Sequence, residues 1–318
     1  MKNISKFTRR RFLSLSCLGI GGCWLGVSNT FAARFVRERI AESGRPIEIP
    51  RCKPYPSKWN DNAIHAAWLG HSTVLLNVFG ITILTDPVLF SRVGASLGIG
   101  TLGPKRLTAP GLTTKELPKI DLVLLSHAHL DHLDMPTLAH FGESTQVVTA
   151  RNTADLLRGT KMSKVNELGW DDKTTLSTRN GEVHIEAFEV NHWGGRWSKK
   201  EDRGWNGYVI SREGKKIIFG GDTAQCDHFR KLRSKGPFEL AMMPIGAYNP
   251  WIRAHCTPEE AVAMANDAGA KYILPIHHQA FTLGREPVNE PIERFDAALQ
   301  NEPERIALRQ VGETFRLG

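Results

Sequence analysis

Apolar positions along the chain recur at two spacings, one typical of buried strands and the other typical of helices. Short apolar or alternating runs predict strands at residues 63–69, 73–79, 81–84 and 119–126. Apolar positions at helical spacing predict helices at residues 135–140, 153–158, 226–234, 258–268 and 291–300. The helix at 258–268 has the clearest beginning, because Thr257 can cap it and Pro258 and Glu259 suit its first turn.

The order of these elements indicates the fold class. A run of strands is followed by helices, and the same order is repeated later in the chain. Such an arrangement suits two sheets that pack face to face with helices on their outer sides. We therefore expect an α+β protein, a four-layer αββα sandwich, that forms one domain over residues 63–318. Residues 33–62 are rich in proline and arginine, have little periodicity and are interpreted as a connector.

A cluster of histidines directly follows one of the predicted strands. The apolar run 121–125 leads into Ser126 and then into the pattern H-x-H-x-D-H at residues 127–132. Side chains two positions apart in an extended chain point to the same side. His127 and His129 can therefore reach one metal ion, and Asp131 and His132 can serve a second ion close by. This density of donors predicts a metal site rather than a set of solvated surface histidines.

Four residues are too few to hold two ions, so later segments must supply further ligands. His192, Asp222 and His277 each come just after a predicted strand, where loops on a rigid scaffold carry function. Asp222 has two carboxylate oxygens and can bridge two cations. His278 is the weaker member of its doublet, because His277 directly follows the apolar strand. The expected ligands are His127, His129 and His192 for one ion, Asp131, His132 and His277 for the other, and Asp222 between them.

The chemistry follows from the types of ligand. All are nitrogen or oxygen donors, which suits two divalent ions, with Zn²⁺ expected first and iron or manganese as alternatives. Two such ions can share a hydroxide, so that no serine or cysteine nucleophile is needed. Asp131 and His255 are the expected catalytic residues. His255 can contact a phosphate oxygen or protonate a leaving alkoxide, and a structural role is the alternative. Tyr248 and His255 are expected to bind substrate, and His71 is expected to hold ligand residues through hydrogen bonds.

Several short motifs beyond the histidines resemble those of the metallo-β-lactamase-fold hydrolases, and within them the N-acylphosphatidylethanolamine-hydrolysing phospholipase D group. The motifs before the cluster are Trp68–Thr73, Thr85–Pro87, Gly103–Arg106 and Leu117–Pro118. The motifs after it are Asn191–Trp193, Gly220–Thr223, Ile245–Tyr248, Pro258–Ala261 and Ile276–His277, with Phe281 shortly after. The likeness spans about residues 63–300. The histidine pattern identifies the superfamily, whereas Gly103–Arg106 and Ile245–Tyr248 point to the subgroup.

The resemblance implies a metallo-β-lactamase fold and a hydrolase that acts through metal-bound hydroxide. The implied reaction is a phospholipase D-like cleavage of glycerophospholipids of the N-acylphosphatidylethanolamine type, or of small phosphodiesters. A lactonase or esterase on the same metal pair is the alternative, because a bridging hydroxide also attacks carbonyl carbon. A non-catalytic metal-binding protein of the cell envelope is the third interpretation, and the complete ligand set argues against it.

The N-terminus resembles an export signal. Thr8–Ser14 fits the twin-arginine pattern, and the apolar stretch at 13–27 is too short and too diluted for a membrane span. We expect residues 1–32 to be a twin-arginine signal peptide that engages the export machinery and is cleaved after Ala32, which places the protein in the periplasm. Cys23 lies in a loose lipoprotein box and offers lipid anchoring as the alternative.

The formal net charge of +8 is mostly due to this N-terminal segment. Five cations and no acidic residue precede Ala32, so removal of the segment lowers the charge to +3. No basic and aromatic cluster supports binding to nucleic acid. The basic residues between 34 and 53 leave two interpretations open, a peripheral contact with an anionic membrane and a solvated connector. Cys52, Cys226 and Cys256 allow at most one disulfide.

Two further features bear on the substrate. The segment 88–118 is long and apolar, and we expect it to border the active site and hold an apolar part of the substrate, with packing over the core as the alternative. Aromatic residues are concentrated near the metal motifs and can wall a lipid groove, lie at a membrane interface or pack in the core. They are Trp193, Trp197, Trp205, Tyr248 and Trp251.

Overall fold

The computed structural model describes residues 31–96 and 100–317, with side chains from residue 37 onward. The twin-arginine motif and Cys23 lie outside the described residues, as do Leu97 and Ile99 of the long segment. Within the described ranges, no helix has both the length and the apolar character that crossing a bilayer requires.

The chain divides into a unit of residues 1–45 and a compact unit that begins at Pro46, before the expected boundary at residue 63. The backbone N–H of Glu48 donates to Leu107 O, and that of Ala109 donates to Glu48 O, both at 2.8 Å. The short turn η1 (Pro56–Lys58) follows. These contacts make residues 46–62 part of the folded domain. Helix α2 (Phe31–Ser43) occupies the earlier part of the expected connector and includes the expected cleavage position.

Seven strands form the first sheet, in the order β15-β1-β2-β3-β6-β7-β8. The strands from β15 to β3 pair antiparallel, whereas β3, β6, β7 and β8 run parallel. The strands are β1 (Ile64–Gly70), β2 (Thr73–Val78), β3 (Ile81–Thr85), β6 (Leu122–Leu124), β7 (Gln146–Ala150), β8 (Lys164–Leu168) and β15 (Thr314–Leu317).

Six strands form the second sheet, in the order β14-β13-β12-β11-β10-β9. Strands β9 to β12 pair antiparallel, and β12, β13 and β14 run parallel. They are β9 (Lys173–Thr178), β10 (Gly181–Phe188), β11 (Gly207–Arg212), β12 (Lys215–Phe219), β13 (Phe238–Pro244) and β14 (Ala270–Ile276). A separate hairpin in the long segment consists of β4 (Ala95–Ser96) and β5 (Thr101–Leu102).

The two sheets share one apolar core, to which alternate residues of each strand contribute. From β1, Ile64 and Trp68 face the space between the sheets, whereas Leu69 faces the opposite side. Phe219 of β12 enters the same core from the second sheet. Both faces of β1 are buried. This double burial explains why the sequence of β1 is apolar at nearly every position rather than alternating.

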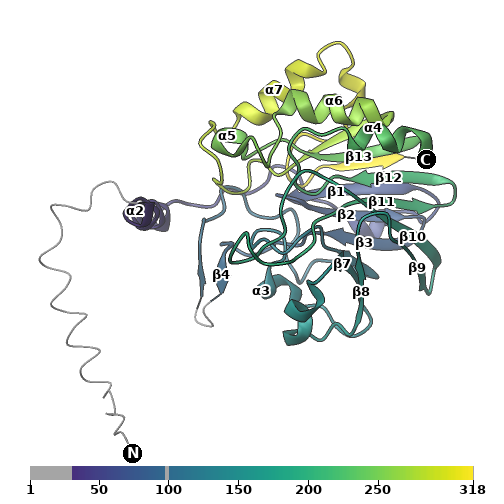
Figure 1. Cartoon of the computed structure of the whole chain (residues 1–318), viewed down its shortest axis with the longest axis horizontal. Coiled ribbons are helices and arrows are strands. Elements are labelled where there is room, and N and C mark those ends of the chain that lie inside the picture. Colours follow the sequence, from purple (N-terminus) through teal and green to yellow (C-terminus); the bar gives the residue numbers. More distant parts are fainter. Residues whose placement is uncertain (1–30, 97–99, 318) are drawn as a thin grey trace, which may run out of the picture. The chain divides into compact units, whose positions relative to one another are not determined.

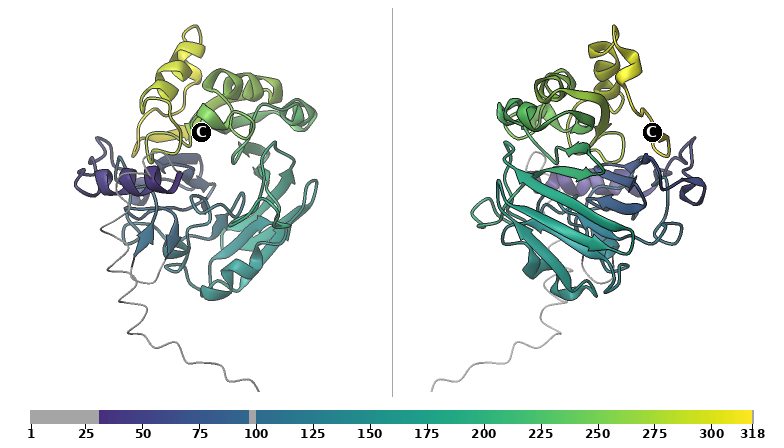
Figure 2. Two further views of the ribbon diagram at one scale, coloured as in Figure 1. Left: turned by 60° about the vertical axis from the view of Figure 1, so that its left-hand side comes forward. Right: turned by 90° about the vertical axis from the view of Figure 1, so that its right-hand side faces the viewer.

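Helices cover the outer faces of both sheets, as Figures 1 and 2 show. Phe229 and Phe295 pack on the outer face of the second sheet, and Leu138 and Leu157 pack on that of the first. The α+β, four-layer αββα sandwich expected from the sequence is thereby confirmed. The helices are α3 (Met135–Leu138), η2 (Ala154–Gly159), α4 (His228–Leu232), η3 (Arg233–Lys235), α5 (Tyr248–Trp251), α6 (Pro258–Ala268), α7 (Glu290–Ala298) and η4 (Pro303–Arg305).

Helix α6 begins and ends as its sequence predicts. The side chain of Thr257 accepts from Glu260 N, and the side chain of Glu260 accepts from the backbone of Thr257, which completes a capping box. Gly269 ends the helix at φ 78°, a conformation that glycine adopts without strain. The helix expected at 153–158 is a 3₁₀ helix instead. The strand expected at 119–126 pairs only over Leu122–Leu124, because the following residues leave the sheet to form the histidine loop.

Candidate metal centre

The expected metal ligands come from loops that follow strands at one edge of the sandwich. The segment His127–His132 follows β6, Asp222 follows β12, and His277 follows β14. Strands β3 and β6 are parallel, as are β12 and β14 through β13, and the carboxyl ends of parallel strands form the usual ligand site of such sheets. His192 lies beyond the end of β10. The topology therefore brings together residues that lie far apart in the sequence.

Three histidines form the first cluster. His127 Nε2 lies 2.8 Å from His129 Nδ1, and His192 Nε2 lies 3.2 Å from the same atom. Zinc–nitrogen bonds of about 2.0–2.1 Å place the ligand nitrogens of a tetrahedral site about 3.3 Å apart. The three facing nitrogens therefore lie close to the spacing that a single ion requires. His129 is partly exposed, so the cluster lies at an opening to solvent.

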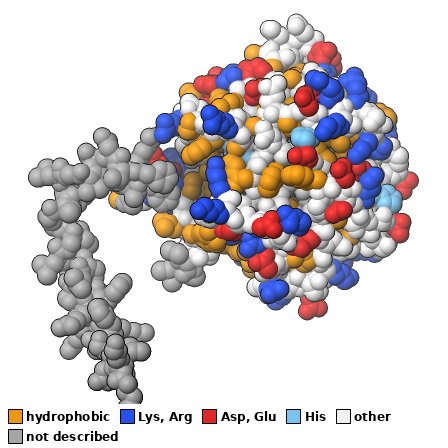
Figure 3. Space-filling view, in the orientation of Figure 1, with side chains coloured by type: hydrophobic (Ala, Val, Ile, Leu, Met, Phe, Trp, Pro, Cys, Tyr) orange, Lys and Arg blue, Asp and Glu red, His pale blue; other side chains and the backbone are white. Residues whose placement is uncertain are grey.

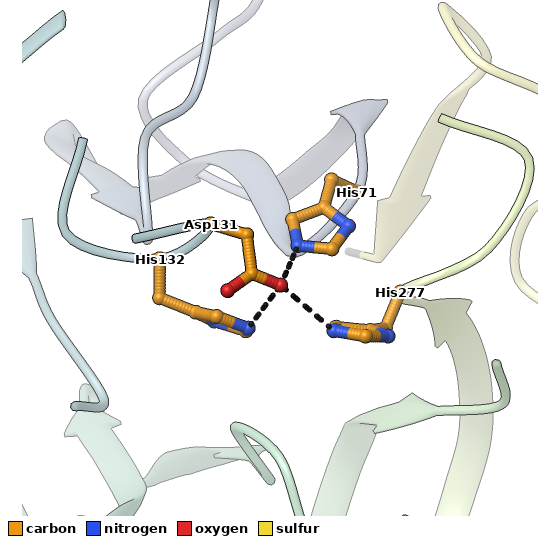
Figure 4. Close-up of side chains that lie close together, drawn as sticks. All are labelled: His71, Asp131, His132 and His277. Carbon is orange, nitrogen blue, oxygen red and sulfur yellow. Dashed lines mark ion pairs between the residues drawn. The ribbon is translucent and has the colours of Figure 1, made fainter. Parts of the chain in front are cut away.

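Asp131 lies at the centre of the second cluster, which Figure 4 shows. Its Oδ2 atom lies 3.6 Å from His132 Nε2 and 3.6 Å from His277 Nε2. His71 Nε2 lies 3.3 Å from the same oxygen. The expectation that His71 holds ligand residues through hydrogen bonds stays a prediction, since Nε2 is near Asp131 but has no hydrogen-bond partner. Its ring nitrogen also points into the cluster, so that these four side chains offer four donors around one point.

The carboxylate of Asp222 connects the two clusters. Its Oδ2 atom lies 3.1 Å from His132 Nε2 and 3.2 Å from His277 Nε2, both in the second cluster. The same oxygen lies 3.9 Å from His192 Nε2, in the first cluster. Asp222 is 2 % exposed, and its Oδ1 atom is buried without a hydrogen-bond partner. One carboxylate oxygen therefore lies near nitrogens of both clusters, and the bridging of two ions stays a prediction.

Asp86 orients the histidine loop, a role that its position in the sequence does not predict. Its carboxylate accepts from Ser126 N at 2.7 Å and contacts His132 Nδ1 at 2.6 Å. The hydroxyl of Ser126 donates to Asp86 and lies 2.8 Å from His127 Nδ1. Both imidazoles therefore carry a proton on Nδ1, and their Nε2 atoms face the clusters. The available signal was the Thr85–Pro87 motif, whose aspartate follows a buried strand.

The segment after His192 holds the first cluster from outside. His192 Nδ1 lies 2.8 Å from Ala254 O, which leaves Nε2 for the cluster. The ring of Trp193 stacks on His192 with a centroid distance of 4.5 Å and meets His129 edge-on at 4.7 Å. Arg196 Nη1 donates to Ala128 O and to Leu133 O, both at 2.9 Å. One guanidinium therefore ties together the two ends of the loop that carries His129, Asp131 and His132.

The donor set fits a metal pair. The buried Nε2 atoms of His71, His132 and His277 have no hydrogen-bond partner, and neither does Asp222 Oδ1. Burial of several polar atoms without partners costs about 1–3 kcal/mol for each atom. A cation at each cluster would give these atoms a partner. The nitrogen and oxygen donors suit Zn²⁺ and also accept iron or manganese.

In the metal-free protein, the carboxylates and two of the histidines hold opposite charges. Burial alone would lower the pKa of His277, but the neighbouring carboxylates of Asp222 and Asp131 raise it to about 9. Burial likewise opposes the charge on His132, and Asp222, Asp131 and Asp86 raise its pKa well above 6.5. Burial would raise the pKa of Asp222, but the charges of His132 and His277 hold it well below its usual range. A bound cation would compete with these protons for the same nitrogens.

The remaining histidines of the site are neutral near pH 7. Burial lowers the pKa of His129 and of His255 to about 4, and burial and the neighbouring His277 lower that of His71 to about 3. Burial and the charge of His132 lower the pKa of His127 well below 6.5. Neutral imidazole is the form that binds a metal ion, so these residues are ready to act as ligands.

Two residues of the site have strained backbones. His71 has φ 56° and His277 has φ 63°, in a region that residues with side chains rarely adopt. The backbone N–H of His277 donates to His71 O at 3.0 Å, so the two strained turns hold each other. Strain of this kind persists where the surrounding structure imposes it, and it is concentrated at functional sites.

The other expected site residues lie as follows. His255 Nδ1 lies 3.8 Å from Asp222 Oδ2 and has no hydrogen-bond partner, so it faces the centre. His278 is buried against Trp68, with ring centroids 4.4 Å apart, and belongs to neither cluster. Tyr248 does not offer a free hydroxyl, because it donates to Glu290 Oε1 at 2.7 Å. This contact occupies the group that was expected to orient a substrate.

Two further expectations concern the long segment and the cysteines. Val88 and Val93 of the long segment pack against Ala280 and Phe281, which lie just beyond His277. The described part of this segment therefore borders the loop that carries a metal ligand. Cys52, Cys226 and Cys256 are all free thiols in the structure.

Comparisons with known proteins agree with this geometry. Residues 82–278 match the family model of the beta-lactamase superfamily domain. A Mycobacterium tuberculosis protein is 32% identical over 284 residues, which cover 86% of this chain and 74% of that protein. N-acyl-phosphatidylethanolamine-hydrolyzing phospholipase D 1 of Caenorhabditis elegans is 31% identical over 279 residues, which cover 82% of this chain and 77% of the relative.

A solved structure shows the same fold. The isothiocyanate hydrolase from Delia radicum gut bacteria superposes with a TM-score of 0.62 at 17% identity, over 80% of this chain and 100% of that chain. At this identity the likeness concerns the fold alone. The chain therefore belongs to the metallo-β-lactamase superfamily as a metal-dependent hydrolase, and its relatives include an N-acyl-phosphatidylethanolamine-hydrolysing phospholipase D.

Proposed function

We propose that the protein is a phosphodiesterase that cleaves glycerophospholipids of the N-acylphosphatidylethanolamine type. Water is consumed, the bond between phosphorus and the head-group oxygen breaks, and phosphatidic acid and the head-group alcohol are released. The observation that carries the proposal is the pair of clusters joined by Asp222 in a chain 31% identical to a named phospholipase D. We choose the lipid from the name of this relative. We infer hydrolysis from the metal-binding side chains of the site.

A bound pair of divalent ions, most suitably zinc, supplies an activated water and stabilises negative charge on the attacking and leaving oxygens. The residues of the chain do the rest. His127, His129 and His192 would hold one ion, and Asp131, His132 and His277 the other, with Asp222 shared. Asp86 and Ala254 O fix the imidazole protons on the outer nitrogens, so that the inner nitrogens stay available.

His255 is the group placed to act on the substrate itself. Its Nδ1 atom faces Asp222 and has no partner, and the ring is neutral because burial lowers its pKa to about 4. A neutral imidazole can donate a hydrogen bond to a phosphate oxygen. An anionic phosphate beside the ring would favour its protonated form, from which a proton can pass to the leaving alkoxide.

The test uses metal-loaded protein, one synthetic phosphodiester, a panel of lactones and one lipid. Hydrolysis of bis(p-nitrophenyl) phosphate is compared with opening of a lactone panel, and products of N-acylphosphatidylethanolamine are identified by mass spectrometry. His255→Ala is expected to lower turnover by roughly 10²–10⁴-fold without loss of metal. His127→Ala is expected to abolish both turnover and metal binding. If fully metallated enzyme opens lactones or esters efficiently and cleaves no phosphodiester, the proposal is wrong and the lactonase alternative replaces it.

We also propose export to the periplasm by the twin-arginine route. The support is the Thr8–Ser14 motif and the concentration of positive charge before Ala32. Replacing Arg9 and Arg10 by lysine is expected to leave a folded, full-length precursor in the cytoplasm, as detected by fractionation and mass spectrometry. Recovery of mature protein only in membranes, with a lipid-modified Cys23 at its N-terminus, would support lipid anchoring instead.

A further inference from the structure

Large apolar side chains remain exposed on two turns next to the metal centre. Trp197 is 68% exposed, Trp251 is 48% exposed and Ile252 is 46% exposed. Figure 3 shows that hydrophobic side chains gather on the face that it presents, with lysine and arginine side chains beside them. Exposed tryptophans cost free energy in water, so a group of them at a functional site indicates a surface that another apolar phase covers.

Both turns contact His192, an expected ligand of the first cluster. Trp193, four residues before Trp197, stacks on the ring of His192. On the other side, Ala254 O contacts His192 Nδ1 at 2.8 Å, and Ala254 N donates to Trp251 O at 2.8 Å. The two exposed tryptophans therefore lie on turns that flank one metal ligand. His129 of the same cluster is partly exposed, so these two turns form a rim beside the part of the centre that solvent reaches.

In each turn a carboxylate accepts hydrogen bonds from backbone N–H groups, which fixes the backbone that carries the exposed apolar side chains. Glu201 accepts from Trp197 N at 2.7 Å and from Ser198 N at 2.9 Å. Glu286 contacts Ala247 N at 2.5 Å and Asn249 N at 3.2 Å, just before Trp251. A turn held by a carboxylate cannot easily fold its tryptophan back onto the protein.

Cations surround these apolar side chains, whereas the nearby acids already have partners. Lys199, Lys200 and Arg253 are exposed, and Lys199 Nζ lies 4.2 Å above the ring of Trp193. Of the acids, Glu201 pairs with Arg203 at 2.9 Å. Asp202 pairs with Arg151 at 2.7 Å, and Glu286 is occupied by backbone N–H groups. The charge that the rim offers to a partner is therefore positive.

We propose that this rim, formed by Trp197, Lys199, Lys200, Trp251, Ile252 and Arg253, binds the surface of an anionic lipid bilayer. Tryptophan side chains suit the boundary between lipid head groups and acyl chains, and each lysine or arginine near an anionic surface adds attraction. Docking there would bring the metal centre to a phosphodiester without removing the lipid from the bilayer. The inference deepens the proposed function and rests on it for the choice of lipid.

The test measures partition and hydrolysis separately. Full-length chain is sedimented with phosphatidylcholine vesicles, with and without phosphatidylglycerol, and activity on bis(p-nitrophenyl) phosphate is measured in the same preparations. Trp197→Ala combined with Trp251→Ala, and Lys199→Glu combined with Lys200→Glu, are each expected to weaken binding to anionic vesicles about tenfold or more. Activity on the soluble diester is expected to stay within about twofold, because none of these residues belongs to the clusters.

Matched controls carry the same changes elsewhere. Tyr55→Ala removes an aromatic side chain that is 57% exposed, and Lys161→Glu combined with Lys164→Glu reverses two exposed cations. These variants are expected to bind like the unmodified protein. Equal binding by all variants, or equal binding to neutral and anionic vesicles, would overturn the inference. Failure to cleave any phosphodiester would refute the proposed function alone, since vesicle binding is measured without hydrolysis.

Discussion

The carboxylate of Asp222 is the residue that both halves of the metal centre share. Its Oδ2 atom lies within 3.2 Å of His132 and His277 and 3.9 Å from His192. Asp86 also lies near a histidine of each cluster, but it faces the outer Nδ1 atom of His132, whereas Asp222 faces the inner Nε2 atoms. At the scale of single residues, the pairing of the two ions therefore depends on one buried carboxylate. Each histidine, in contrast, serves one cluster.

The first prediction concerns this shared carboxylate. Asp222→Ala is expected to lower the metal content from about two ions per chain to less than one, because both sites lose a ligand. His277→Ala is expected to lose mainly one ion. His278→Ala is the control, since His278 packs on Trp68 and should leave metal content unchanged. Metal content is measured by plasma mass spectrometry. Retention of both ions by Asp222→Ala would show that the carboxylate does not bridge them.

At the scale of elements, the loop between β6 and α3 carries four of the seven expected ligands and forms no regular structure of its own. Its geometry depends on other segments. Asp86 holds its beginning through Ser126, and Arg196 binds the carbonyls of Ala128 and Leu133. Asp134 ends the loop by capping α3 through Thr137 N at 3.1 Å. Hydrogen bonds from neighbouring segments therefore hold the loop at its beginning and at its end.

The second prediction tests the contribution of Arg196. Arg196→Met removes the donor of two hydrogen bonds to the loop. Loss of a residue that orients metal ligands typically weakens metal binding about 10–100-fold, so we expect zinc to pass to a chromogenic chelator faster by about that factor. Arg196→Lys keeps one cationic donor and is expected to restore part of the retention. Arg151→Met is the control, because that arginine forms an exposed pair with Asp202. Identical release rates for Arg196→Met and the unmodified protein, with unchanged circular dichroism, would contradict this assignment.

At the scale of the whole compact unit, the centre lies where the strand ends of both sheets meet. The sheets are held together by an apolar core that includes Trp68 and Phe219. The first sheet supplies the histidine loop, and the second supplies Asp222 and His277. The site therefore exists only when both sheets are folded and packed, and metal binding should be linked to global stability.

The third prediction follows from this linkage. In the metal-free protein the pKa of His277 is about 9, against 6.5 for an unperturbed histidine. Because the folded pKa is raised, protonated His277 stabilises the metal-free protein fully below about pH 6.5, and this stabilisation is lost as the pH rises through about 9. A metal ion needs the unprotonated ring, so binding strengthens over the same window.

The measurement compares thermal unfolding of chelator-treated and zinc-loaded protein between about pH 6.5 and 9. The melting temperature of the metal-free form is expected to fall, and the difference between the two forms is expected to widen. His277→Gln is expected to flatten the dependence of the metal-free form on pH. A difference that narrows as the pH rises would contradict the prediction.

Much of the fold was predictable because local chemistry and burial agree in it. The segments that form β1 to β3 are apolar because both faces of these strands are covered. Helix α6 starts where Thr257 and Glu260 form a capping box. The histidine pattern directly after a buried strand was predictable for a similar reason. Its spacing is local, so two ligands of one cluster and two of the other are visible within six residues.

The remainder needed the tertiary structure. The sequence alone indicated the layers and a set of candidate donors, because strand periodicity and ligand spacing are properties of neighbouring residues, and the superfamily came from the resemblance of its motifs. Only the fold decided that Asp86 orients His132, that His71 points into a cluster and that Tyr248 is engaged by Glu290. These contacts join residues separated by tens of positions in the chain. Their geometry is set by how two sheets and their loops pack, which no local pattern encodes.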